Sequence, residues 1–182
     1  MEVFKDIAGY EGLYQVSNLG RVRSIARNTT SGRFLKPATD GRGYQFVHFS
    51  KDGKHKMFKV HRLVASAFLP KPLDTNATEV NHKDENKANN IIALNFDGSV
   101  NVEQSNLEWC TKEYNNNYGT RIERISKAIS KPVLQFTKSG EFVKEWQSTH
   151  EVQRVLGIAN QNIGKCCLGK LHTSGGYIWR YA

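Results

Sequence analysis

The chain has 182 residues and a mass of 20.6 kDa, and 38% of its residues are hydrophobic, which suits several small modules better than one thick core. It contains no apolar run long enough to span a membrane, and its start, MEVFKDIAGY, lacks the segments of a secretory signal. We therefore expect a soluble, cytoplasmic protein with no membrane partner. Three cysteines without a CxxC pair exclude a disulfide framework and a zinc ribbon.

The charge of the chain alternates in sign. Residues 1–75 hold 13 basic and 6 acidic side chains, residues 76–111 hold 2 and 6, and residues 112–182 hold 11 and 5, which together give the net charge of +9. Two basic arms around an acidic centre are expected when the arms bind phosphates and the centre holds a cation. General basicity for solubility would not require this alternation.

A β-hairpin is predicted near the start of the chain. Residues 13–16 and 21–25 flank the sequence SNLG, in which asparagine and glycine tolerate the positive φ angles of a tight turn. The period of two along a strand places Arg21 and Arg23 on one face and Val22 on the other. The guanidinium groups would then face outward while the apolar side packs.

The next elements are a second hairpin and a short helix. Residues 44–49 alternate in polarity and meet residues 57–60 across the turn-rich sequence SKDGKHK. From His61 the apolar residues follow helical spacing as far as Phe68, and Pro70 ends that pattern. Strand, long loop, strand and helix are then expected through residue 118.

The last fifty residues predict a third hairpin, two short helices and a closing strand. Residues 133–137 and 142–146 flank the turn KSG, and GGYIWRY provides the closing strand. Ser148 or Thr149 caps a helix that ends at Gly157, and Asn160 caps a second helix. Two short helices joined by a glycine turn are typical of a helix-turn-helix.

The centre of the chain carries the motif with the most chemical content. The segments NHKDENKANN, SNLEWC and KEYNNN resemble the HNH nuclease motif, in which two strands and a helix hold one divalent cation, the ββα-metal arrangement. KDIAGYEGLYQVSNLGRVRS, KPVLQFTKSGEF and GGYIWRY resemble the modular DNA-binding repeats of phage- and intron-encoded HNH homing endonucleases of the HmuI type. The resemblance covers nearly the whole chain.

Together with the predicted elements, this resemblance implies an elongated, multi-module chain of the α+β class. Residues 1–60 would form an N-terminal DNA-binding module of antiparallel β-hairpins, and residues 61–118 the ββα-metal nuclease core. Residues 119–131 would be a basic connecting segment, and residues 132–182 a C-terminal DNA-binding module with a β-hairpin and the helix-turn-helix. The connecting segment would be a helix that lies along a DNA groove, or a plain packed linker.

The resemblance also implies roles for four residues of the centre. His82 matches the general base, and a neutral imidazole can accept a proton at cellular pH. Asn81 and Asn115 match the positions whose side-chain oxygens hold the metal, and Asn106 matches the catalytic-motif residue that ties the long loop to the second strand. Two oxygen ligands completed by water and phosphate suit one Mg²⁺ or Mn²⁺ ion per site and not zinc.

Two departures from the family pattern lie in the centre. The HmuI type carries an aspartate where this chain has Asn81, whose amide supplies an oxygen but no charge. The sequence IIALNFDGSVNVEQS, residues 91–105, lengthens the connection before Asn106. Asp84, Glu85 or Asp97 would then make an outer contact to the cation, or would simply be solvated loop carboxylates.

Several residues could have a structural role in place of a functional one. Asn89-Asn90 and residues 115–117 could be turn and cap residues, because asparagine bonds local backbone well. Arg62 would pair with a carboxylate or with a DNA phosphate. The remaining histidines are expected to be hydrogen-bonded structural residues: His48, His55, His61, His150 and His172.

The expected partner is double-stranded DNA, bound by a monomer along an asymmetric site. The strand with Arg21 and Arg23 would enter the major groove, while most basic side chains contact phosphates. Gln161 and Asn162 would read adenines from the second C-terminal helix, unless they form a solvated polar face. The predicted contacts are Arg21, Arg23, Arg33, Lys36, Arg42, Lys54, Lys56, Arg121, Arg124, Gln161, Asn162 and Lys165.

These features predict a site-specific DNA endonuclease of the homing type that nicks DNA by hydrolysing a phosphodiester bond. A sequence-specific DNA-binding regulator whose nuclease has decayed is the alternative. An RNA-binding or intron-splicing accessory is a third hypothesis, which rests on basic charge and aromatic strands alone.

Overall fold

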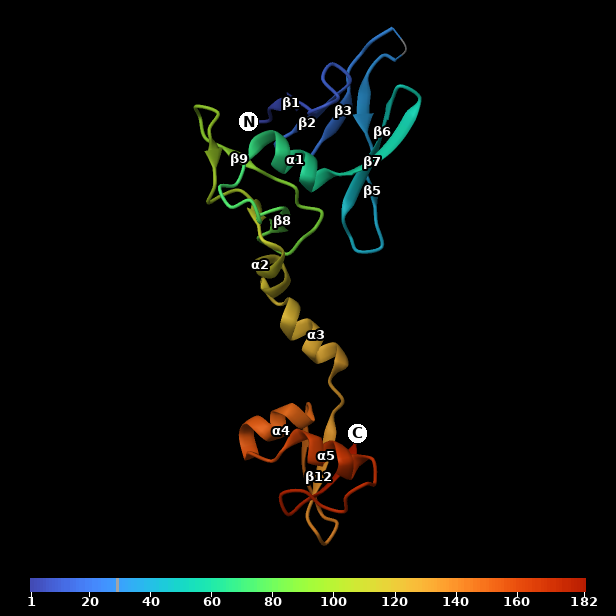
Figure 1. Cartoon of the computed structure of the whole chain (residues 1–182), viewed down its shortest axis with the longest axis vertical. Coiled ribbons are helices and arrows are strands. Elements are labelled where there is room, and N and C mark those ends of the chain that lie inside the picture. Colours follow the sequence, from blue (N-terminus) through green and yellow to red (C-terminus); the bar gives the residue numbers. More distant parts are fainter. Residues whose placement is uncertain (29) are drawn as a thin grey trace. The chain divides into compact units, whose positions relative to one another are not determined.

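The computed structural model describes residues 1–28 and 30–182, and these form two compact units, residues 1–119 and residues 120–182 (Figure 1). Short antiparallel sheets and short helices alternate along both units, so the predicted α+β class is confirmed. Among the described residues, no helix has the length and apolar character needed to cross a bilayer.

The first sheet of the first unit has four antiparallel strands in the order β1-β2-β3-β4. They are β1 (Phe4–Asp6), β2 (Tyr14–Ser17), β3 (Val22–Ser24) and β4 (Arg33–Leu35). The predicted first hairpin is confirmed, with Val16 opposite Val22 and Gly20 at φ +83° in its turn. β1 and β4, which extend this hairpin on both sides, were not predicted.

The second sheet joins β5 (Ala38–Thr39), β6 (Gln45–Lys51) and β7 (Lys54–Lys59). The predicted second hairpin is confirmed, but its strands are longer than expected. Asp52 and Gly53 both adopt positive φ angles and close the hairpin in two residues, so most of SKDGKHK belongs to the strands. The predicted helix follows at once as α1 (Val60–Phe68).

The predicted order of strand, long loop, strand and helix is confirmed in β8 (Glu79–His82), β11 (Leu107–Cys110) and α2 (Lys112–Asn117). β8 and β11 pair in an antiparallel sheet. The long connection contains a small hairpin of its own, β9 (Ala93–Leu94) paired with β10 (Val100–Asn101). The insertion between residues 91 and 105 is therefore ordered structure.

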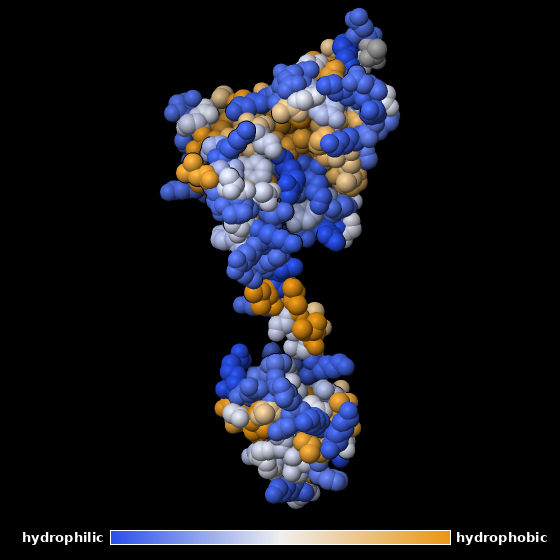
Figure 2. Space-filling model, in the orientation of Figure 1, coloured by the Kyte–Doolittle hydropathy of each residue, from blue (hydrophilic) through white to orange (hydrophobic). Residues whose placement is uncertain are grey.

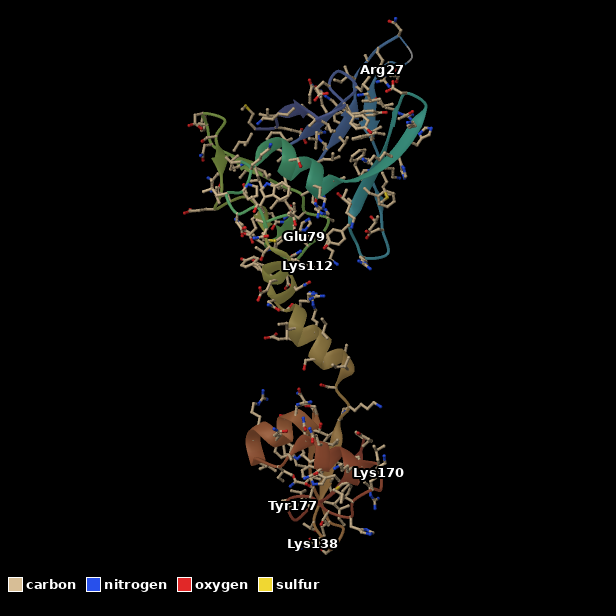
Figure 3. The ribbon with its side chains drawn as sticks, viewed as in Figure 1. Arg27, Glu79, Lys112, Lys138, Lys170 and Tyr177 are labelled. Carbon is tan, nitrogen blue, oxygen red and sulfur yellow. The ribbon has the colours of Figure 1, made fainter. Side chains whose placement is uncertain are left out.

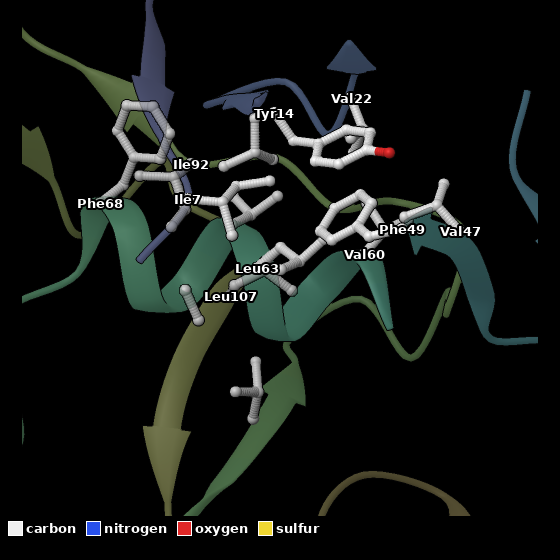
Figure 4. Packing of buried hydrophobic residues seen from close by; sticks show 14 residues of the cluster. Ile7, Tyr14, Val22, Val47, Phe49, Val60, Leu63, Phe68, Ile92 and Leu107 are labelled. Carbon is white, nitrogen blue, oxygen red and sulfur yellow. The ribbon is translucent and has the colours of Figure 1, made fainter. Parts of the chain in front are cut away.

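One hydrophobic core holds the first unit together (Figure 4). It takes Val16 and Phe49 from the two N-terminal sheets, Val64 from α1, and Ile92 and Leu107 from the centre of the chain, all nearly or fully buried. Residues on both sides of position 60 therefore pack into the same core. The nuclease motif lies on a structure that the N-terminal sheets help to build.

The second unit contains α3 (Arg121–Ile129), a three-stranded sheet of order β13-β12-β14 and two further helices. Its strands are β12 (Val133–Phe136), β13 (Phe142–Trp146) and β14 (Ile178–Tyr181), and its helices are α4 (Thr149–Leu156) and α5 (Asn160–Cys167). The predicted third hairpin, the closing strand and both helices are confirmed. Val133, Val152, Ile163 and Trp179 form its buried core.

The capping residues predicted for the two C-terminal helices are confirmed for α4 and wrong for α5. Ser148 caps α4 by accepting a hydrogen bond from the backbone N–H of Glu151, and Gly157 ends that helix at φ +70°. The predicted Asn160 cap is wrong, because Asn160 is the first residue of α5 and the cap position belongs to Ala159. Asn160 instead donates from its own backbone N–H to the Gln153 side-chain oxygen, at 3.0 Å.

A substitution at Phe49 tests the packing of the core of the first unit. Its ring is fully buried and stacks on Tyr14 and on Phe58, with ring centroids 4.2 and 4.9 Å apart. We expect Phe49→Ala to lower the free energy of unfolding by about 3–5 kcal/mol, because the lost ring leaves a cavity. Phe96→Ala, at a fully exposed ring in the β9–β10 turn, should change it by less than about 0.5 kcal/mol. Urea denaturation of both variants measures the difference, and equal effects would contradict the packing.

Candidate active site

The two strands and the helix that resemble the nuclease motif form one local unit. In the β8–β11 pair, Asn81 lies opposite Glu108 and His82 opposite Leu107. The Thr111 hydroxyl caps α2 by accepting a hydrogen bond from the backbone N–H of Tyr114, and α2 then packs against β8. Figure 3 labels Glu79 and Lys112, the first residues of β8 and α2.

Asn81 is held in one orientation by its neighbour across the sheet. It is only 5% exposed, and its Nδ2 donates a hydrogen bond of 2.8 Å to Oε1 of Glu108. Its other side-chain atom, Oδ1, is an acceptor that suits a cation. Asn115 is the one residue of α2 that is half-buried, and α2 packs against β8.

His82 is buried at the end of β8, 4% exposed, and its Nε2 lies 3.0 Å from Oδ1 of Asn90. Burial lowers the pKa of His82 below its usual value, and the hydrogen bond with Asn90 opposes that shift. The imidazole is therefore neutral at neutral pH. A neutral ring with one nitrogen engaged in a hydrogen bond can accept a proton at the other.

Asn106 connects the long loop to the start of β11. Its Oδ1 accepts a hydrogen bond from the backbone N–H of Asp84, and its Nδ2 donates to the Asp84 carboxylate and to the carbonyl of Asn89, at 2.9, 2.9 and 2.6 Å. Its carbonyl accepts from the backbone N–H of Lys83. Burial tends to raise the pKa of Asp84, but hydrogen bonds to its carboxylate, above all the one from Asn89, hold that pKa below its usual value. The Asn106 side chain thus joins the start of β11 to the loop that follows His82.

Sequence reasoning missed the side chains that surround His82. His61, in α1, meets the His82 ring edge-on with centroids 5.2 Å apart, and the Tyr44 ring lies 4.9 Å from His61 and 5.9 Å from His82. Asn90, interpreted as a possible turn residue, is 2% exposed and contacts His82 directly. Tyr44 and His61 lie far from His82 along the chain, so no spacing pattern could have joined them, whereas Asn90 follows His82 by eight residues in the same loop.

His61 was expected to be a hydrogen-bonded structural residue, but one of its two ring nitrogens makes no hydrogen bond. His61 is 4% exposed, and its Nδ1 is buried without a hydrogen-bond partner. Burial lowers the pKa of His61 to about 3, and the neighbouring His82 adds to that effect. The ring is therefore an uncharged neighbour of the candidate base.

Arg62 and Asp97 both bond to neighbouring side chains of the protein. Arg62 pairs with the Glu79 carboxylate at 2.7 Å, and Asp97 bonds Ser99 in the β9–β10 turn. Within residues 1–28 and 30–182, no three His, Cys, Asp or Glu side chains are placed to hold a metal ion together. The candidate ligands of this chain are amides, which are a different donor set.

The basic residues predicted to contact DNA lie on several surfaces. Arg23 lies on the β1–β4 sheet, where the Gln15 oxygen accepts two bonds from its guanidinium and the Phe4 ring centroid is 4.0 Å away. Arg21 pairs with Glu2 and lies over Phe34. Val22 is buried, as the strand period predicts.

The remaining predicted contacts are divided between the two units. In the first unit they lie on β4, on the segments before and after β5, and on β7, and in the second unit they lie on the exposed surfaces of α3 and α5. They are Arg33, Lys36, Arg42, Lys54, Lys56, Arg121, Arg124, Gln161, Asn162 and Lys165. Figure 2 also shows apolar side chains over α3, where Ile122, Ile125 and Ile129 are exposed.

Comparisons with known proteins identify the class. The NUMOD4 motif matches residues 2–50. The DNA endonuclease I-HmuI of Bacillus phage SP01 is 35% identical over 98% of this chain and 97% of its own. The uncharacterized HNH endonuclease L245 of Acanthamoeba polyphaga mimivirus is 35% identical over 92% of this chain, which spans 45% of that longer protein. A solved structure of DNA binding and cleavage by I-HmuI aligns over 99% of this chain and 98% of its own, with 32% identity and a TM-score of 0.49.

The chain therefore belongs to the family of HNH homing endonucleases. Its likeness to the phage enzyme extends over nearly the full length of both proteins, including the N-terminal and C-terminal arms. This confirms the family that the motifs of the centre and of the arms resemble.

The buried His61 predicts a pH dependence of stability. In the folded chain it stays neutral down to about pH 3, whereas in the unfolded chain it takes up a proton near pH 6.5. The unfolded state binds more protons in this window, so the free energy of unfolding falls by up to about 1.4 kcal/mol for each unit that the pH is lowered. Urea denaturation at pH 7.5 and pH 5 should show a smaller fall for His61→Phe than for the parent. Parallel losses in the two proteins would contradict the buried neutral ring.

Proposed function

We propose that the chain hydrolyses a phosphodiester bond of double-stranded DNA at a site built from β8, β11 and α2, with His82 as the general base. The observation that carries this proposal is the buried, neutral His82 beside Asn81 at the end of β8, with one ring nitrogen held by Asn90. A general base must be uncharged and oriented before it can remove a proton from water.

The residues present fit one oxygen-bound divalent cation. The hydrogen bond from Asn81 Nδ2 to Glu108 leaves Asn81 Oδ1 for the ion, and Asn115 on α2 would supply a second amide oxygen. Few protein oxygens completed by water and phosphate suit Mg²⁺ or Mn²⁺. When bound, the ion would stabilise charge on the scissile phosphate and on the departing oxygen. Asn81 carries no charge, but the Glu108 carboxylate that it bonds places a negative charge next to it.

The remaining steps are assigned to side chains of this protein. His82 takes the proton of the attacking water, and Asn106 keeps the loop between His82 and β11 closed through its bonds to Asp84 and Asn89. The edge-on His61 ring and the Tyr44 ring limit the positions open to the His82 ring. These two uncharged rings hold the base in place.

The arms would hold the DNA. Basic side chains of the first unit and of α3 bind phosphates, and Gln161 and Asn162 of α5 read base edges. Arg23 would approach DNA as a guanidinium already oriented by Gln15. A single site of this kind on a monomer bound to an asymmetric sequence cuts one strand, so we propose nicking.

His82→Ala tests the base. We expect it to lower the rate of DNA cleavage in Mg²⁺ by about 10²–10⁴, because general-base catalysis contributes that much, while the dissociation constant for DNA stays within about twofold. A strand-labelled duplex on a denaturing gel measures cutting and shows whether one strand or both are cut. Binding without any Mg²⁺-stimulated cutting by the parent would favour a DNA-binding regulator. A variant that cuts as fast as the parent would remove His82 from the mechanism.

Glu108→Gln tests the cation site. Its side-chain oxygen still accepts from Asn81 Nδ2, but the negative charge is lost, so the Mg²⁺ concentration for half-maximal cleavage should rise several-fold. Glu113→Gln, at an exposed position of α2, is the matched control and should leave that concentration unchanged. Equal Mg²⁺ dependence of the two variants would argue against a cation beside Asn81. Chelation by EDTA should stop cutting by all of them.

A further inference from the structure

The catalytic histidine contacts the N-terminal module through Asn90. Asn90 Oδ1 lies 3.0 Å from His82 Nε2, and Asn90 Nδ2 donates to Gln45 Oε1 at 2.9 Å and to the carbonyl of Ala88 at 3.3 Å. Gln45 is the first residue of β6, within the residues matched by NUMOD4. A chain of side-chain hydrogen bonds thus runs from the second N-terminal sheet to the candidate base.

The backbone carbonyl of Ala88 settles the direction of these bonds. A carbonyl oxygen only accepts, so the Asn90 atom that faces it must be the donor Nδ2. The acceptor Oδ1 then faces His82, and the neutral imidazole must carry its proton on Nε2. Nδ1 is consequently the nitrogen that can accept a proton.

A second part of the N-terminal module holds the backbone around Asn90. Asn18, 1% exposed in the β2–β3 turn, donates from Nδ2 to the carbonyl of Ile92 at 2.9 Å, and its own carbonyl accepts from the Ile92 N–H at 2.7 Å. In the same turn, a Cβ at Gly20 would lie 3.0 Å from Cβ of Asn90. The turn therefore packs directly against the residue that orients His82.

We propose that the N-terminal module is part of the active site: Gln45, with the Asn18–Gly20 turn, holds Asn90 so that His82 keeps its proton on Nε2 and presents Nδ1 to the attacking water. This inference rests on the proposed role of His82 as the base. Gln45 and Asn90 are positioning residues, because they act through His82. The module matched by NUMOD4 thereby has a role in catalysis in addition to a role in DNA binding.

Three variants separate the acceptor role of Gln45 from its bulk. Gln45→Met keeps the size and removes the acceptor, and it should lower kcat by about tenfold or more while the dissociation constant for DNA stays within about twofold. Gln45→Glu keeps an acceptor oxygen for Asn90 Nδ2 and should retain most of the activity. Gln104→Met, the same exchange at an exposed loop residue, should cut at the parent rate. Circular dichroism and thermal unfolding check that each variant folds.

The proton position is measured without cleavage, by ¹⁵N NMR of histidine-labelled protein with the His82 signals assigned through His82→Gln. The parent should show a protonated Nε2 and an unprotonated Nδ1, and in Gln45→Met the two ¹⁵N shifts should move toward each other as both tautomers become populated. A parent with its proton on Nδ1, a Gln45→Met variant with the parent kcat, or a Gln45→Glu variant as slow as Gln45→Met would each overturn the proposal. If the parent cuts no DNA, the proposed function fails, and the NMR result still decides the tautomer.

Discussion

The arrangement of the site depends on the packing of α1 between the N-terminal sheets and the β8–β11 pair. The fully buried Val64 of α1 lies in the same core as Val16, Phe49 and Leu107, so β8, which carries Asn81 and His82, and its partner β11 are held against the N-terminal sheets. A strand pair of four residues per strand would not be stable alone. The small nuclease motif is stabilised because its side chains pack into the same core as the module that precedes it.

Most of the regular elements could be predicted from local patterns. The SNLG turn, the helical spacing after His61 and the Ser148 and Gly157 caps all act within a few residues, and each is confirmed. The turn at Asp52-Gly53 was predicted too long because its lysine-rich flanks look like a loop, although an edge strand tolerates them. The short strands β1 and β4 are defined by their pairing with β2 and β3.

The candidate site could be predicted only as far as the motif extends. Asn81, His82, Asn106 and Asn115 follow from the resemblance to the HNH motif, and the fold brings their elements together. Tyr44 and His61 contact the His82 ring, and Gln45 bonds Asn90, through tertiary contacts that no local sequence signal records. The surroundings of the candidate base are therefore what the structure adds, and burial explains why His82 stays neutral.

The β9–β10 hairpin is closed at both of its ends. Ile92 is bonded to Asn18, and the backbone N–H of Asn106 donates to the carbonyl of Ile91 at 3.0 Å. Because Ile91 and Asn106 at its two ends are bonded to each other, the length of the hairpin between them does not affect the geometry of the candidate catalytic residues. Related nucleases can gain or lose residues there at little energetic penalty, and protein engineers could graft a peptide tag or a reporter onto this hairpin tip.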